Sequence, residues 1–263
     1  MSEKYAYATL LSSDRYIPGV LGLYYSLKYH KCKYPLVVII TDHMEISIQT
    51  IKFFEDLNIK YHIVKDLRNY YCDDRMVTPD YLEAFQSSRQ NADLFQVNMM
   101  NKLYLWELKE FDKVCYFDAD IIIGANIDFV FNYPTPAGKP LQLEFCNDKE
   151  NMQVAGENWL ICPQDFISVE SMLPLVDGRE GFDENILSKL YGPWNVTALR
   201  LSDESKYLFH SHVHTAKFNY WETNLELDYK NCVQEMENFI NNLFQNAEDP
   251  EWPFRELIKQ KAD

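Results

Sequence analysis

The sequence has no closely spaced cysteine pair and few glycines, and each shortage excludes a class of site. Its six cysteines are scattered and form no C-x-x-C pair, which argues against a zinc cage or a disulfide framework and favours free, buried thiols. Its eight glycines form no G-x-G-x-x-G or G-x-x-x-x-G-K-[ST] loop, so neither a Rossmann dinucleotide site nor a P-loop is supported. A G-x-S-x-G nucleophile elbow is also missing.

Basic residues and long apolar runs are scarce as well. The chain has 25 Lys and Arg against 40 Asp and Glu, a net charge of -15, which disfavours nucleic acid or an anionic membrane surface as a partner. No window reaches the roughly 18 apolar residues that a membrane span requires. The first residues lack the basic-then-apolar layout of a signal peptide. We therefore expect a cytoplasmic protein without a membrane span.

The chain does contain enough apolar material for a large folded domain. It has 263 residues, of which 47% are hydrophobic and 15% aromatic. In the first part, buried-strand patterns alternate with helical ones: strands are predicted over 5–11, 35–41 and 59–64, and helices over 18–30 and 46–57. This alternation predicts βαβ units, and therefore an α/β fold with a mainly parallel central sheet.

The rest of the chain is less regular. After an irregular excursion over 66–90, a helix is predicted over 92–108; further on, strands are predicted over 141–145, 159–162 and 208–213, and a helix over 183–191. An apolar stripe near the C-terminus predicts one more helix, through Val233, Met236, Phe239, Ile240, Leu243 and Phe244. No repeat, Gly/Ser linker or charge block marks a boundary, so we expect one domain over residues 1–263.

Two carboxylates interrupt the apolar run from Val114 to Ile123. Asp118 and Asp120 stand one residue apart in a stretch rich in β-branched and aromatic residues, which is typical of a buried strand. Strand geometry would point both aspartates the same way and Ala119 the other way. Burying an unpaired carboxylate is costly, so the pair predicts a counter-charge, and a divalent cation would fit. The alternative is a turn at the strand end with solvated acids.

A histidine cluster lies late in the chain, where His210, His212 and His214 alternate along a predicted strand and Lys217 follows. Such a strand would point the three imidazoles to one side. Imidazole binds transition metals, and a lysine is a point charge suited to phosphate. Two acids with one imidazole would suit Mn²⁺ better than Zn²⁺. The alternative is a set of partly exposed surface histidines.

Three neighbouring segments carry a family resemblance. They are N-K-L-Y-L-W-E-L from Asn101, F-D-K-V-C-Y-F-D-A-D from Phe111 and G-A-N-I-D from Gly124. Together they resemble the glycogenin and galactinol synthase group, the family 8 retaining glycosyltransferases. The resemblance covers residues 5–221. It implies a single Rossmann-like, nucleotide-sugar-binding domain of the family A glycosyltransferase type, with residues 222–263 as a C-terminal helical extension.

The resemblance also implies a metal site and two catalytic candidates. By that match Asp118, Asp120 and His210 hold Mn²⁺, which bridges the diphosphate of a UDP-sugar. Asp183, in F-D-E-N-I-L, resembles the family's aspartate beside the transferred sugar. Lys217 follows His210 by the spacing of galactinol synthases. Asp183 and Lys217 are therefore the candidate catalytic residues.

The donor-binding residues are also implied by the resemblance. Lys102 matches the lysine that reaches the donor's phosphates, and the first strand and loop match the segments that hold uracil and ribose. The implied donor-binding set is Thr9, Leu10, Ser12, Ser13, Tyr16, Lys102, Asp118, Ala119, Asp120 and Lys217.

Two stretches depart from the family pattern. The family closes with Lys-Pro-Trp, whereas this chain continues from Lys217 through F-N-Y to Trp221. Counting back from Trp221 places the family spacing on His212, so His212 or His214 could replace His210 as the ligand. The family's Asn-Ser-Gly or Asn-Ala-Gly beside the sugar is represented here by Val154-Ala155-Gly156.

The activity implied is metal-dependent transfer of a hexose from a UDP-sugar to a hydroxyl group. UDP-glucose is the first candidate donor and UDP-galactose the second; the acceptor is a sugar, a polyol or a protein hydroxyl, including one of the chain's own 18 tyrosines. A homodimer is implied by resemblance alone. Two alternatives stay open. One is a non-catalytic UDP-sugar sensor or scaffold; the other is a haloacid dehalogenase-type phosphatase, which expects Thr or Val where this chain has Ile122.

Overall fold

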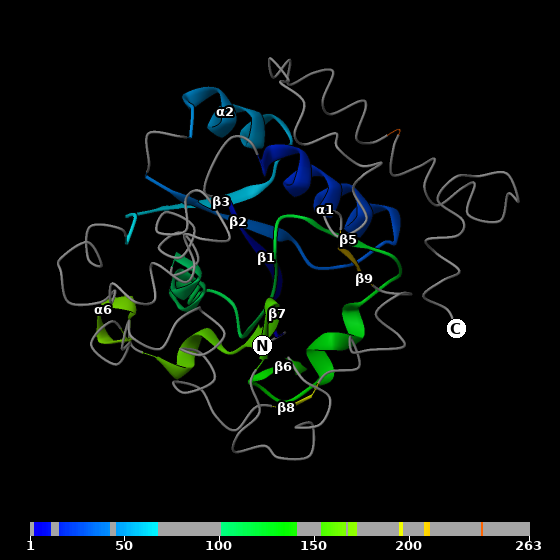
Figure 1. The fold of residues 1–263 in the computed structure, drawn as a ribbon, viewed down its shortest axis with the longest axis vertical. Helices are drawn as coiled ribbons and strands as arrows, with labels where there is room; N and C mark the ends of the chain where they lie inside the picture. The colour runs from blue at the N-terminus through cyan, green and yellow to red at the C-terminus, as the bar shows by residue number, and fades with distance from the viewer. Residues whose placement is uncertain are drawn as a thin grey trace, which may run out of the picture.

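A mixed, mostly parallel sheet organises the part of the chain that the structure, a computed structural model, describes (Figure 1). The described residues are 3–11, 16–42, 46–67, 101–140, 154–166, 168–172, 195–196, 208–210 and 238. Within them, seven strands follow the order β3 (Lys60–Val64), β2 (Leu36–Thr41), β1 (Tyr5–Leu11), β4 (Lys113–Phe117), β7 (Val154–Ile161), β6 (Ala137–Pro140) and β8 (Asn195–Val196). A second sheet pairs β5 (Ile121–Ile123) with β9 (Leu208–His210).

The first half of the sheet is built from parallel crossovers. Strand β1 pairs in parallel with β2 and with β4, and β2 pairs in parallel with β3. Helix α1 (Ile17–Tyr29) connects β1 to β2, and α2 (Ile48–Asp56) connects β2 to β3. Strand β7 runs antiparallel to both β4 and β6. The predicted α/β fold with a mainly parallel sheet is confirmed, and each element through β3 lies within two residues of its predicted bounds.

The two faces of the sheet bury different apolar clusters. In β1, Tyr7 and Leu11 face a cluster with the apolar residues of α1 and α2, which we call the first core. Ala8 and Leu10 face the opposite cluster, the second core, which contains Trp106 from the 3₁₀ helix η2 (Asn101–Glu107). This alternation follows from the two-residue period of a strand. Both faces of β1 are therefore covered, as expected for a parallel sheet.

The run from Val114 to Ile123 is two strands and not one, which corrects the strand prediction. Strand β4 ends at Phe117, a turn contains Ala119 and Asp120, and β5 begins at Ile121. The amide of Ile121 donates to the carbonyl of Asp118 at 3.1 Å and closes the turn. The expectation that strand alternation orients the two aspartates is therefore wrong. Strand β5 leaves the main sheet and pairs with β9 instead.

Several predicted elements can be followed only in part. The helix predicted over 92–108 is described only from residue 101, where it is a 3₁₀ helix through Glu107. The predicted strand 208–213 is described as β9 over Leu208–His210, and the predicted strand 159–162 belongs to the longer β7. The excursion after Leu67, the strand 141–145, the helix 183–191 and the C-terminal stripe lie outside the described residues. In the described ranges, no helix has the length and apolar character needed to cross a membrane.

The cysteines within the described ranges are free thiols, but only one of the three is buried and the other two are half-buried. They are Cys32, Cys115 and Cys162. Cys115 on β4 is 1% exposed, and its burial raises the pKa of its thiol. A protonated, buried thiol is inert, so we assign Cys115 a packing role.

Candidate active site

The two aspartates follow the carboxyl end of β4, where the strand order of the sheet reverses. The order runs outward from β1 through β2 to β3, and β4 then lies on the other side of β1. Open α/β sheets bind ligands at such a switch point, outside the carboxyl ends of the strands. Asp118 follows the end of β4, and Leu11 ends the neighbouring parallel strand. The fold therefore places the aspartate pair at the edge where a ligand is expected.

The turn that carries the pair is held by backbone contacts on two sides. The amide of Asp118 donates to the carbonyl of Glu157 at 3.0 Å and so ties the turn to β7. On the other side, Gly19 of α1 approaches the turn so closely that an added Cβ would lie 2.2 Å from the carbonyl oxygen of Ala119. Only glycine fits this approach without moving the helix or the turn.

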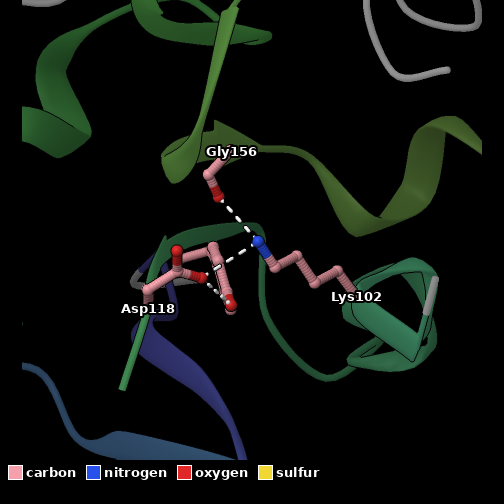
Figure 2. Close-up of polar contacts among 4 residues, drawn as sticks. Lys102, Asp118 and Gly156 are labelled. Atoms are coloured by element: carbon pink, nitrogen blue, oxygen red, sulfur yellow. Dashed lines mark hydrogen bonds and ion pairs between the residues drawn. The ribbon is translucent and has the colours of Figure 1, made fainter. Parts of the chain in front are cut away.

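Lys102 supplies the positive charge beside Asp118. Its Nζ lies 3.0 Å from Asp118 Oδ1 and donates to the carbonyl of Gly156, also at 3.0 Å (Figure 2). The ring centroids of Tyr116 and Trp159 are each 5.2 Å from this ammonium. The Lys102 side chain is 2% exposed and that of Asp118 28%. The ion pair therefore has a buried cation and a carboxylate that solvent can reach.

Tyr116 provides a second donor to the same carboxylate oxygen. Its hydroxyl donates to Asp118 Oδ1 at 2.5 Å, within the range of a hydrogen bond to a charged acceptor. Its ring is 1% exposed and contacts Trp159 with the centroids 5.2 Å apart. Oδ1 of Asp118 therefore accepts from a tyrosine on β4 and from a lysine on η2.

The backbone brings residue 210 to the aspartate turn. In the antiparallel pair of β5 and β9, His210 is directly opposite Ile121, the residue that follows Asp120. Facing residues in such a pair have Cα atoms about 4.5–5.5 Å apart. The side chain of His210 is not among the described ones, and His212 and His214 lie outside the described residues. The strand pairing thus brings together two segments that are far apart in the sequence.

The implied uracil and ribose residues divide into buried and exposed ones. Thr9 and Leu10 on β1 are 0% and 5% exposed, and Tyr16, immediately before α1, is 48% exposed. The hydroxyl of Thr9 is buried and has no hydrogen-bond partner among the described residues. Ser12 and Ser13 lie outside the described residues. Tyr16 is therefore the member of this set whose side chain the structure shows to be accessible.

Two further candidates, Asp183 and Lys217, also lie outside the described residues. Their roles remain those that the family resemblance implies. The described part of the site is thus the part predicted to bind the metal and the donor's phosphates. It consists of Lys102, Asp118, Ala119 and Asp120, with the backbone of residue 210.

The donor atoms at the turn fit a hard divalent cation. Asp118 and Asp120 contribute carboxylates, and the register of β9 brings the backbone of His210 beside them. Among the described side chains, no group of three or more His, Cys, Asp or Glu forms a metal cluster. Carboxylates joined by one imidazole would make an oxygen-rich set, which suits Mn²⁺ better than Zn²⁺. These residues are compatible with the predicted cation.

Sequence reasoning missed two residues of the site, Tyr116 and Gly19. A signal for Tyr116 was available, because it lies on the strand that ends directly before Asp118 and its hydroxyl can donate to a carboxylate. Gly19 gave no such signal, since a glycine near a helix start has many explanations. Its close approach to Ala119 depends on how α1 packs against the turn.

The sequence matches a known family over much of its length. Residues 8–153 match the family described as Glycosyl transferase family 8. Galactinol synthase 2 of Arabidopsis thaliana is 33% identical over 133 residues, which are 50% of this chain and 35% of the relative. Glycogenin-1 of Homo sapiens is 26% identical over 211 residues, covering 74% of this chain and 50% of the relative. The matched part of the chain thus spans about a third of the length of the plant relatives.

Solved structures agree on the fold. The galactosyltransferase LgtC in complex with donor and acceptor sugar analogs superposes with a TM-score of 0.53 at 14% identity. The match covers 74% of this chain and 73% of that one. At this identity the likeness supports the fold and not the substrate.

Proposed function

We propose that this chain, a member of glycosyl transferase family 8, is a metal-dependent retaining hexosyltransferase. Its membership follows from residues 8–153, which match the family and make up more than half of the 263 residues. The observation that carries the proposal is the arrangement at the carboxyl end of β4. There Asp118 and Asp120 occupy a turn, Lys102 pairs with Asp118, and β9 brings residue 210 alongside. This constellation has the charges needed to hold and activate a nucleoside diphosphate sugar.

The reaction requires stabilisation of the leaving group. Breaking the bond between the anomeric carbon and the diphosphate oxygen leaves the electron pair, and negative charge, on UDP. We assign Asp118, Asp120 and His210 as the ligands of Mn²⁺, with His212 and His214 as alternatives to His210. When bound, the cation would act as a Lewis acid that neutralises the charge of the diphosphate and orients it.

Lys102 contributes charge from within the protein. Its side chain is 2% exposed, so its ammonium acts in a medium of lower dielectric than water and its field on a nearby phosphate is correspondingly stronger. Its contacts with Asp118 and Gly156 fix its position before substrate binds. We propose that Lys217 adds a second positive charge at the diphosphate.

Retention of configuration needs a group on the face of the sugar opposite the leaving UDP, or attack on the same face. In the first route Asp183 bonds to the anomeric carbon as the bond to UDP breaks; the acceptor hydroxyl oxygen then displaces the carboxylate, and its proton passes to a phosphate oxygen of UDP. In the second, Asp183 hydrogen-bonds the sugar while the acceptor attacks a short-lived oxocarbenium ion. In both routes we propose that the Asp183 carboxylate lies near the anomeric carbon.

We propose UDP-glucose as the donor, followed by UDP-galactose, and a hydroxyl on a sugar, a polyol or a protein as the acceptor. Thr9, Leu10, Ser12, Ser13 and Tyr16 form the proposed uracil and ribose site. Within the same proposal the chain is one domain with its core in 5–221, acts in the cytoplasm, and forms a homodimer. The phosphatase alternative is not retained, because the chain belongs to a glycosyltransferase family.

UDP release from a panel of UDP-sugars, with Mn²⁺ and with EDTA, tests the proposal. We expect release from one hexose donor, and loss of release with EDTA and in Asp120→Asn. Lys113→Met is a control outside the site, because Lys113 begins β4 and its amine donates to the carbonyls of Phe131 and Tyr133. Metal-dependent donor binding without turnover for any acceptor would instead favour the sensor alternative. If no UDP-sugar binds in a metal-dependent manner, the proposal fails.

A further inference from the structure

Asp118, a proposed metal ligand, accepts a hydrogen bond from Tyr116, whose own position is fixed by the core. Tyr116 belongs to β4, is 1% exposed, and its ring contacts Trp159 of β7. Its hydroxyl donates to Asp118 Oδ1 at 2.5 Å. Because the ring is buried in the second core against Trp159, the hydroxyl has little freedom, and the carboxylate must adapt to it.

The same oxygen also pairs with Lys102. The ammonium lies 3.0 Å from Asp118 Oδ1 and over the faces of the two rings, Tyr116 and Trp159. Two donors from separate elements, β4 and η2, therefore converge on one oxygen. Two such bonds restrict both the rotation of the carboxylate and the direction of its second oxygen.

We propose that Tyr116 is a positioning residue, whose hydroxyl holds the Asp118 carboxylate in the orientation that receives the divalent cation. The proposal rests on the proposed function, since it requires Asp118 to be a metal ligand. Partners that hydrogen-bond a metal ligand orient it, and their loss typically weakens metal binding by about 10–100-fold.

A merely structural role for this hydroxyl predicts a different outcome. The chain contains a matched pair for this distinction, because the Tyr7 hydroxyl donates to Asp128 Oδ1 at 2.8 Å. Tyr7 is also a buried tyrosine on a neighbouring strand, β1. Tyr116→Phe and Tyr7→Phe each remove one hydroxyl and keep the ring. If both hydroxyls only stabilise the fold, the two variants should behave alike.

The test is a Mn²⁺ titration without any sugar nucleotide, with free Mn²⁺ followed by electron paramagnetic resonance. Wild type, Tyr116→Phe, Tyr7→Phe and Asp120→Asn are compared, each with its thermal unfolding midpoint in EDTA. We expect Tyr116→Phe to weaken Mn²⁺ binding by about 10-fold, the lower end of the usual range. Tyr7→Phe should bind Mn²⁺ as the wild type does, although its unfolding midpoint falls.

The outcomes separate the inference from the function on which it rests. If the wild type binds Mn²⁺, Asp120→Asn does not, and Tyr116→Phe matches the wild type, the positioning role is overturned while the metal site stands. Equal weakening in Tyr116→Phe and Tyr7→Phe would also overturn it, because the effect would then be general. If the wild type binds no Mn²⁺, both the inference and the proposed metal site are wrong.

Discussion

Asp118 and Asp128 each accept a hydrogen bond from a buried strand tyrosine, but their other partners differ. Asp128 accepts from the Tyr7 hydroxyl at 2.8 Å and from the backbone amide of Lys33 at 3.1 and 3.2 Å. Asp118 accepts from the Tyr116 hydroxyl and pairs with the buried ammonium of Lys102. Asp128 thus joins backbone segments, whereas Asp118 is held by the charge of a lysine.

This difference indicates which aspartate is available for chemistry. Asp128 opens the 3₁₀ helix Asp128–Asn132, and its carboxylate links that helix to the loop before β2. Asp118 lies at the carboxyl end of the sheet, where an open α/β fold binds ligands. A buried lysine with its aspartate keeps charge at that edge, where a leaving diphosphate would need it. We therefore propose that the same kind of tyrosine–aspartate bond has a structural role at Asp128 and supports the donor site at Asp118.

The largest effect is expected from Lys102→Met, which removes what distinguishes Asp118 from Asp128. Losing one partner of a buried pair leaves a charge uncompensated, and we expect a loss of about 3 kcal/mol in the free energy of unfolding, at the low end for such pairs. The low end applies because Asp118 is 28% exposed. UDP release should fall by about 100-fold, as when a preorganised donor is removed. Urea unfolding and the UDP release assay provide the two measurements.

Lys113→Met is the matched control for this change. The Lys113 amine donates to two backbone carbonyls at 2.8 and 2.7 Å, at the opposite end of β4 from the aspartate turn. Its loss should lower stability by about 1–2 kcal/mol and leave UDP release intact. If Lys102→Met retained wild-type UDP release, the assigned role of Lys102 would be wrong.

A smaller effect is expected from Gly19→Ala, which pushes on the turn without removing any charge. The added Cβ would lie 2.2 Å from the Ala119 oxygen, so the helix or the turn must shift. Overpacking of this kind costs about 1–3 kcal/mol, partly offset by about 1 kcal/mol of better helix propensity. A displaced aspartate should weaken Mn²⁺ binding and UDP release by about 10-fold.

Gly138→Ala separates this effect from general crowding. Its Cβ would meet Val154 Cγ1 at 3.2 Å, which is a side-chain contact away from the turn. We expect Mn²⁺ binding to be unchanged in this variant. Equal Mn²⁺ binding by Gly19→Ala and the wild type would show that the turn tolerates the shift.

The smallest effect is expected in the pH dependence of stability, through His30, which is linked to Asp128 by Asn126. Burial lowers the pKa of His30 below its usual 6.5, and the His30 carbonyl accepts from Asn126, which also contacts Asp128. The unfolded state then binds more protons than the folded state just below pH 6.5, so stability falls as pH falls through that window. The slope from one such group is below about 1.4 kcal/mol per pH unit. Urea unfolding between pH 7 and 5 should therefore show a shallower decline in His30→Gln, with UDP release at pH 7 unchanged.

Much of the fold could be predicted because it depends on local patterns. The apolar run of β1 gave its bounds directly, and α1 differs from its predicted range by one residue at each end. The aspartates were predicted at the end of a buried strand, but the apolar residues after them were included in the same run and form a second strand, β5. A hydrophobic run alone does not show where a chain turns when both sides of the turn are buried.

The site divides in the same way. The sequence alone determined the alternation of strands and helices and the position of Asp118 and Asp120 after a buried strand, since both follow from the periods of local structure. The tertiary structure decided that Lys102 pairs with Asp118, that Gly156 accepts from the same lysine and that His210 is opposite Ile121. These contacts join segments far apart in the chain, and they depend on strand order and register. Residue periodicity does not encode that order, because many sheet arrangements bury the same apolar faces.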